Sequence, residues 1–191
     1  NFSIGLSGRY IFSNLTGAFT GPDAQAGNSV AADVGIYYTR LLQGTRNSTL
    51  SLGAQISNIG AKISYTDNNN KDFLPTNLRL GGAYTTELDV YNSITFILDF
   101  NKLMVPSPGS GRDSVSLLSG MFGSFSDAPG GAKEEFQEFM ISTGVEYWYR
   151  NIFAARLGYF NENADKGNRK YLTMGVGFRK NNFGIDRAYN V

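Results

Sequence analysis

Apolar and polar residues alternate with a period of two along most of the sequence. Successive side chains of a β-strand point to opposite faces, so this pattern predicts strands with one apolar and one polar face. In the first such stretch, the even positions carry Phe2, Ile4, Leu6, Tyr10 and Phe12. Further stretches of the same kind are 30–39, 50–57, 77–84, 94–101, 139–149, 153–159, 171–178 and 183–189.

Two features of the predicted strands favour a membrane barrel over a soluble sheet. The stretches run to about 9–12 residues, whereas a strand needs about 9–11 to cross a bilayer and soluble sheets usually use ~5–6. Large aromatic residues stand toward strand ends on the apolar register, as in the aromatic girdles of outer-membrane barrels. A soluble sandwich with tyrosines at its rim is the alternative.

The connections between the predicted strands alternate in length. The long ones are 14–29, 60–76, 103–136 and 161–169, and the short ones are 41–48, 88–92, 150–151 and 180–182. Outer-membrane barrels have short periplasmic turns and long external loops, which produces this alternation. A soluble sandwich has no reason to keep it. The sequence therefore predicts an all-β fold, a transmembrane antiparallel β-barrel in a bacterial outer membrane.

The absence of two residue types narrows the possible chemistry. The sequence has no cysteine and no histidine, which excludes Cys or His nucleophiles, a His general base, and zinc or haem sites built from these ligands. Glu134 and Glu135 are adjacent carboxylates, but we expect them to lie in a solvated loop. We therefore predict a protein that is not an enzyme, with no catalytic residue, cofactor or metal. The net charge of +1 argues against nucleic acid as a partner.

Charges of both signs fall on the polar register of the predicted strands. Paired charges in a confined lumen neutralise one another, whereas a selective pore would carry a ring of one sign. Glycines on the same register leave room for another chain segment to approach. We therefore predict a crowded or plugged lumen with a charge network, and the open pore is the competing interpretation. The network residues are Arg9, Asp33, Arg79, Asp99, Glu146 and Arg156.

The longest loop contains a short amphipathic pattern. A polar stretch, Pro106–Arg112, precedes Ser114–Phe125, in which apolar residues recur near helical spacing. This spacing predicts a helix with an apolar face in an external loop. Such a face either folds into the barrel mouth as a lid or binds a partner, and the sequence does not decide between the two. The candidate partner-binding residues are Val115, Leu118, Phe122 and Phe125.

The two ends of the chain both fall inside alternating stretches. We therefore expect residues 1–191 to be a single outer-membrane β-barrel domain that is incomplete at both ends. In the last stretch, Arg187 stands on the apolar register, where a charge costs about 2–4 kcal/mol at mid-bilayer and near zero at the interface. That end is either interfacial or not a continuous strand.

Several stretches resemble the PorV (LptO) family of the Bacteroidetes type IX secretion system, which is similar in fold to the FadL transporters. The resemblance spans nearly the whole chain, although the FLPTNLRLGGAY stretch is shared with FadL relatives and is less specific. The stretches are NFSIGLSGRYIFSNL (1–15), LGAQISNIGAKISYT (52–66), FLPTNLRLGGAY (73–84), MFGSFSDAPGGAKEE (121–135) and GNRKYLTMGVGFRKNNFGID (167–186).

The resemblance implies a fold and a role. The fold would be a FadL-like barrel of fourteen strands with a plugged lumen, of which about nine lie in this chain. The role would be that of a shuttle that binds the C-terminal domain of secreted cargo at a large translocon barrel. The shuttle then delivers the cargo to the sortase and attachment complex, with outer-membrane lipid around it. The alternative is a FadL-type outer-membrane transporter of hydrophobic small molecules.

Overall fold

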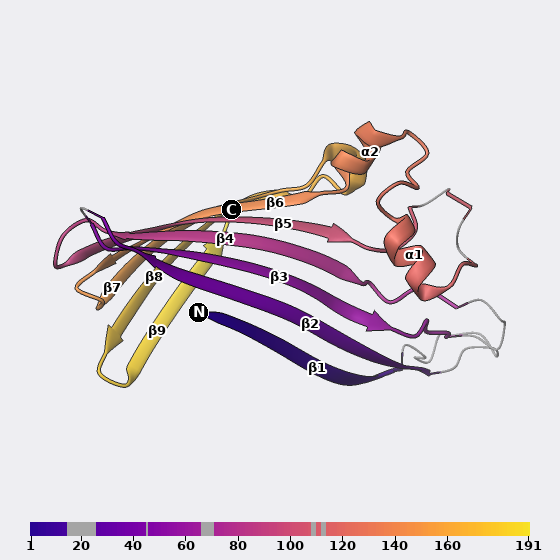
Figure 1. Ribbon diagram of the computed structural model, residues 1–191, viewed down its shortest axis with the longest axis horizontal. Helices are drawn as coiled ribbons and strands as arrows, with labels where there is room; N and C mark the ends of the chain where they lie inside the picture. The colour runs from indigo at the N-terminus through magenta and orange to yellow at the C-terminus, as the bar shows by residue number, and fades with distance from the viewer. Residues whose placement is uncertain (15–25, 45, 66–70, 108–109, 112–113) are drawn as a thin grey trace.

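The computed structural model describes the chain except for residues 15–25, 45, 66–70, 108–109 and 112–113. Its main feature is one antiparallel sheet of nine strands, in which each strand pairs with the next along the chain (Figure 1). The strands are β1 (Phe2–Ser13), β2 (Gly27–Leu42), β3 (Ser48–Gly60), β4 (Asn77–Glu87), β5 (Asn92–Leu103), β6 (Met140–Tyr149), β7 (Phe153–Asn161), β8 (Lys170–Lys180) and β9 (Phe183–Asn190).

The predicted strands are confirmed, and so is the alternation of their connections. The short turns gather at one end of the sheet and the long loops at the other (Figure 1). The β6–β7 turn places Arg150 and Asn151 at φ 53° and 54°, the left-handed backbone that a tight hairpin turn requires. The sheet is barrel-like but open, because β1 and β9 each pair with one neighbouring strand among the described residues.

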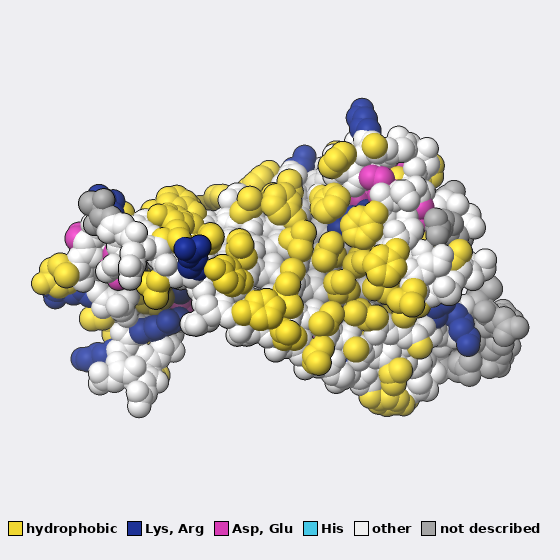
Figure 2. Space-filling model, in the orientation of Figure 1, with side chains coloured by type: hydrophobic (Ala, Val, Ile, Leu, Met, Phe, Trp, Pro, Cys, Tyr) yellow, Lys and Arg dark blue, Asp and Glu magenta, His cyan; other side chains and the backbone are white. Residues whose placement is uncertain are grey.

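Strand register separates the side chains into two faces. Residues opposite each other in an antiparallel pair share a face, and Leu6 stands opposite Val34 while Ser7 stands opposite Asp33. We call the first side the apolar face and the second the polar face. Large side chains on the apolar face are open to the surroundings: Leu6 is 79% exposed and Val176 61%. Figure 2 shows these hydrophobic side chains covering the middle of the sheet, with most charged ones near its two ends.

The helices lie in the long loops. They are α1 (Leu117–Gly123) and α2 (Ala132–Gln137) between β5 and β6, and a 3-10 turn, η1 (Ala164–Lys166), between β7 and β8. Among the described residues, no helix is long and apolar enough to cross a membrane. The predicted helix in Ser114–Phe125 is present but shorter, because the Ser116 side chain caps it by accepting a hydrogen bond from the backbone N–H of Ser119.

The last strand removes one of the two alternatives for Arg187, that of a discontinuous strand, and an interfacial position stays a prediction. Residues of β9 pair continuously with β8, and Arg187 stands opposite Val176 on the apolar face. The end of the chain is therefore a regular strand, with an exposed arginine at its edge.

Candidate functional site

The first cluster on the polar face joins β1, β2 and β3. Arg9 forms an ion pair with Asp33, which also accepts hydrogen bonds from Ser7 Oγ (2.9 Å) and the Asn58 backbone N–H (2.8 Å). Arg9 Nη2 donates to Asn58 Oδ1 at 2.8 Å. Asn58 can bond to both Asp33 and Arg9 because the β2–β3 pairing shifts register between Ala32 and Val34. This shift leaves Asn58 in a left-handed conformation with φ 59°.

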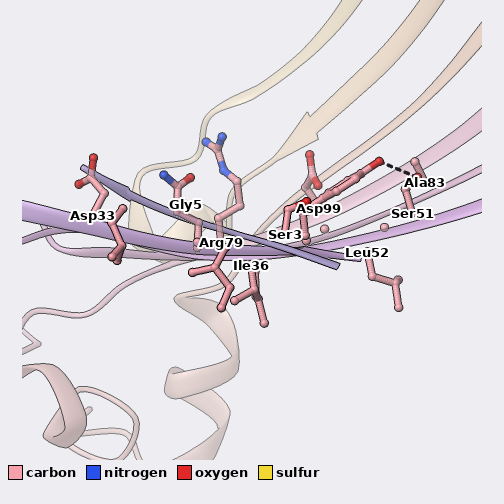
Figure 3. A pocket seen from close by; sticks show the side chains of 18 of the residues that line it. Ser3, Gly5, Asp33, Ile36, Ser51, Leu52, Arg79, Ala83 and Asp99 are labelled. Atoms are coloured by element: carbon pink, nitrogen blue, oxygen red, sulfur yellow. Dashed lines mark hydrogen bonds between the residues drawn. The ribbon is translucent and has the colours of Figure 1, made fainter. Parts of the chain in front are cut away.

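Arg79 and Asp99 lie next to this cluster but do not bind each other directly. Arg79 Nε donates to Asn101 Oδ1 at 2.7 Å, and the Asp99 carboxylate covers Gly81, where a Cβ atom would collide with it. Figure 3 shows Asp33, Arg79 and Asp99 pointing to one side of the sheet, and Ile36 and Leu52 pointing to the other. Between these charged groups, the polar face therefore consists of backbone and glycine residues, which leave open space.

A second ionic cluster occupies β6 to β9. Arg156 Nε binds Glu146 Oε2 at 2.5 Å, and Arg156 Nη1 binds Asp186 Oδ1 at 2.5 Å. The Trp148 ring lies beside two guanidinium groups, 4.6 Å from that of Arg179 and 5.5 Å from that of Arg156. All six residues predicted for a charge network thus share the polar face. That this face lines a closed, filled lumen stays a prediction.

A third cluster was not predicted, and it fixes the loop between β5 and β6. Lys102, whose side chain is 0% exposed, binds Glu135 Oε2 at 3.2 Å and Glu138 Oε2 at 2.5 Å. Lys166 from η1 binds Glu134 Oε1 at 2.5 Å and Glu138 Oε1 at 3.0 Å. We call these five residues the Lys102 cluster. It ties α2 both to the end of β5 and to the β7–β8 loop.

The Lys102 cluster corrects one prediction. Glu135 does not lie in a solvated loop: it is 9% exposed, and its Oε1 accepts a hydrogen bond of 2.7 Å from the Ala128 backbone N–H. The available signal was Lys102 itself, a lone charge on the apolar register of β5 between Phe100 and Met104. A charge in that position requires a partner that covers it.

Ionisation in the Lys102 cluster follows from these contacts. Partial burial works to raise the pKa of Glu138, but hydrogen bonds from Lys102, Ser107 and Lys166 outweigh it and hold that pKa below its usual value. Burial likewise works to lower the pKa of Lys166, but its hydrogen bonds to Glu134 and Glu138 raise that pKa instead. The carboxylates and the lysine ammonium therefore stabilise each other's charged forms.

Of the four apolar residues predicted on the helix, Leu118 and Phe122 lie on α1, and Val115 and Phe125 lie just outside it. We call the three exposed ones, Leu118, Phe122 and Phe125, the apolar stripe of α1. Leu118 is 60% exposed, Phe122 67% and Phe125 40%, while Val115 is half-buried. The opposite side of α1 is packed, since a Cβ atom on Gly120 would lie 2.8 Å from Phe73 Cε1. The structure thus places three of the four residues at the surface, at the long-loop end of the sheet (Figure 1). Their binding of a partner stays a prediction.

The described residues contain no group of three or more His, Cys, Asp or Glu side chains arranged to hold a metal ion. The features available for function are therefore the ionic polar face and the exposed apolar stripe of α1.

Comparison with known proteins gives the family. The family model described as Type IX secretion system protein PorV matches residues 1–110, which include β1 to β5. No curated protein matches the chain. The family match covers 110 of the 191 residues, more than half of the chain. The chain therefore belongs to the PorV family, whose members are outer-membrane components of the type IX secretion system.

Proposed function

We propose that this chain is a non-enzymatic shuttle of type IX secretion. It binds the C-terminal domain of a secreted protein at a large translocon barrel and delivers it to the sortase and attachment complex. The single observation that carries the proposal is the family match over residues 1–110. The exposure of Leu118, Phe122 and Phe125 supports it, since exposed apolar patches mark interaction sites.

We further propose that the sheet crosses the outer membrane several times as part of one closed barrel domain, with fourteen strands as in the FadL-like fold. Hydrocarbon offers no hydrogen-bonding partner, so every strand edge in a membrane must be paired. The edges β1 and β9 each need a further neighbour. Closure by additional strands satisfies this requirement, and outer-membrane lipid then contacts the apolar face.

The ionic clusters of the polar face support a filled lumen over an open pore. Arg9 pairs with Asp33, and Arg156 with Glu146 and Asp186, so charges of both signs alternate on the described part of this face, whereas an ion-selective pore carries a ring of one sign. Cargo proteins are far too large for such a lumen. Contacts with cargo therefore belong on the external loops, where α1 lies.

The experiment that tests the shuttle is binding of an isolated cargo C-terminal domain to the intact protein in detergent. A double variant, Leu118→Ser with Phe122→Ser, removes the centre of the stripe. If the stripe is a binding hot spot, its loss weakens binding by about 2 kcal/mol or more, roughly 30-fold in Kd. The matched control is Leu88→Ser with Val90→Ser, two exposed residues of the β4–β5 turn at the opposite end. Equal affinity of both variants would contradict this role of α1.

A FadL-type transporter of hydrophobic small molecules is the second candidate. The observation that favours it is that Tyr37 and Ile97 are 48% and 37% exposed on the polar face, beside the glycines that line the same open pocket. Affinity purification of the intact protein from its native membrane separates the two. A co-purifying translocon or cargo domain supports the shuttle, whereas the barrel alone with bound lipid in its lumen supports uptake.

A further inference from the structure

The α1–α2 segment contains an apolar groove that shares Phe125 with the stripe of α1 but not Leu118 or Phe122. Its apolar lining residues are Phe125, Ala132, Phe136 and Phe139, and its volume is about 300 Å³. We call it the phenylalanine groove. Phe136 is 77% exposed, an unusual position for a large aromatic ring in water. A groove lined by exposed aromatic side chains is typical of a binding site for an apolar ligand or partner.

The groove lies on the apolar side of the sheet. Lys102 marks this side, because it stands opposite Leu78 on the apolar face of β5, two residues beyond Phe100. The Lys102 Nζ atom is 5.6 Å from the ring centroids of both Phe125 and Phe139. Figure 2 shows hydrophobic side chains continuing along this face to the end of the sheet that carries α1 and α2. The groove therefore extends the apolar face beyond the last strand residues.

The height of the groove fits the edge of the hydrocarbon layer. From Ile94, the first apolar residue of β5 on this face, to Lys102 is eight residues. At about 3.3 Å per residue and a tilt of about 40°, Lys102 stands about 20 Å above Ile94, within the apolar band of about 25 Å in outer-membrane barrels. If the sheet crosses the membrane as proposed, with Ile94 at the lower edge of the apolar band, the rings of Phe125 and Phe139 beside Lys102 reach the level of the outer-leaflet acyl chains.

The charges beside the groove are paired with one another and largely covered. Among the lining residues of the groove, only Glu135 is acidic. Its carboxylate accepts a hydrogen bond from the Ala128 backbone N–H and forms an ion pair with Lys102. Lys102 is wholly covered. Each charge of the Lys102 cluster is thus paired within the protein, and an aromatic surface is left outside. This arrangement suits contact with hydrocarbon better than contact with water.

We propose that the phenylalanine groove holds an acyl chain of an outer-leaflet lipid, so that α2 rests in the membrane interface. The part of the segment that lines the groove, from Phe125 to Phe139, is then part of the membrane-facing wall of the protein. This role rests on the proposed membrane crossing but not on cargo binding by Leu118 and Phe122, which lie outside the groove, so the cargo and lipid proposals can fail separately.

Photo-crosslinking in reconstituted vesicles tests the proposal. The intact protein is reconstituted in phosphatidylethanolamine vesicles with tracer phosphatidylcholine that carries a diazirine in one acyl chain. After irradiation, mass spectrometry should find label on peptides containing Phe125, Phe136 or Phe139, as well as on the apolar face of β5. Ala132→Phe, which fills the groove, should reduce the label on the segment several-fold and leave that on β5 unchanged. Label confined to the strands would overturn the proposal.

A second measurement does not depend on the groove-filling variant. The chain has no cysteine, so a nitroxide can be placed singly by Phe136→Cys, with Pro129→Cys in the exposed turn between the helices as the control. The label at 136 should collide more with oxygen, which concentrates in the bilayer, than with a water-soluble nickel chelate. Equal chelate access at both positions overturns the proposal. Shielding that develops only when a cargo domain is added also overturns it and assigns the groove to a protein partner.

Discussion

Lys102 is a buried charge whose two carboxylate partners come from a different segment of the chain. Its ammonium group lies on the apolar face of β5, and Glu135 and Glu138 cover it from α2. An ion removed from water is tolerated only when paired and hydrogen-bonded. The position of α2 is therefore tied to a single side chain of the sheet.

Replacing Lys102 should release this segment. Lys102→Met keeps a similar volume but leaves two carboxylates without their buried partner, a loss of about 3–5 kcal/mol for breaking one half of a buried pair. We expect faster hydrogen exchange and protease cleavage within 117–139, while the strands keep their protection. Lys133→Met, on the exposed side of α2, is the matched control and should exchange like the unaltered protein. Unchanged exchange in Lys102→Met would show that the ion pairs do not hold α2.

Glu138 and Lys166 predict how the same segment responds to pH. The pKa of Glu138 is lowered from 4.5, so its stabilising contribution is complete above about pH 4.5 and is lost as the pH falls through the lowered value. The pKa of Lys166 is raised from 10.5, so its contribution is complete below pH 10.5 and is lost as the pH rises through the raised value. The segment should therefore stay docked between these limits and loosen outside them.

A fluorophore on Pro129→Cys can follow this pH response in the folded barrel. We expect a constant signal across the neutral range and a change in acid below the ordinary range of a glutamate. Adding Glu138→Gln should remove most of the acid transition, because the amide cannot titrate. If that variant keeps the full transition, Glu138 is not the group responsible.

At the scale of the strand, neighbouring residues of β5 face different surroundings. Leu98 lies on the apolar face and Ile97 on the polar face, and they are 44% and 37% exposed. Leu98→Arg should cost about 2–4 kcal/mol if its surroundings are hydrocarbon at mid-bilayer. Ile97→Arg adds the same group to the polar side and should be tolerated. Urea titration of refolding into vesicles, read by heat-modifiable migration on gels, measures both. A similar cost for both variants would refute the assignment of faces.

The strands could be predicted because the sequence carries two signals for each: the alternation of apolar and polar residues along the strand, and the turn residues that end it. The pairing of Leu6 with Val34 and of Ser7 with Asp33 follows once both strands keep their period. Elements that depend on distant partners could not be predicted this way. The six residues of α2 are too few to form a stable helix alone, and they are held by Lys102 and Lys166 from other segments.

The same distinction explains which parts of the candidate site were found. Arg9, Asp33, Glu146 and Arg156 fall on the polar register of regular strands, so their common face could be inferred. Asn58 could not be placed, because its left-handed backbone arises from a register shift between β2 and β3. The residue pattern of a single strand does not reveal a shift in how that strand pairs with its neighbour. The exposed position of Phe136 could not be predicted either, because it depends on the formation of α2.

At the scale of the whole molecule, apolar surface is concentrated outside and not in a core. The buried hydrophobic cluster consists of Ala31, Ile63 and Leu74, with Ile11 and Tyr65 packed against it. Large side chains of the apolar face, from Leu6 on β1 to Tyr189 on β9, stay exposed. Soluble monomers rarely expose contiguous apolar patches beyond a few hundred Å². The apolar face of the described sheet therefore needs apolar surroundings outside the sheet, and under the proposed membrane crossing these are hydrocarbon.

This surface predicts how the intact protein behaves when its apolar surroundings are removed. It should remain in the membrane pellet after alkaline carbonate washing, and after extraction it should be monodisperse only in detergent or reconstituted lipid. Exchange into surfactant-free buffer should cause aggregation, because the apolar faces of separate molecules then bury one another. Size-exclusion chromatography with light scattering measures this, and transfer into amphipathic polymer is the control that replaces detergent without exposing the face to water. A monodisperse protein in plain buffer would mean that another protein surface covers the apolar face, and the placement of both the sheet and α2 in a bilayer would then be wrong.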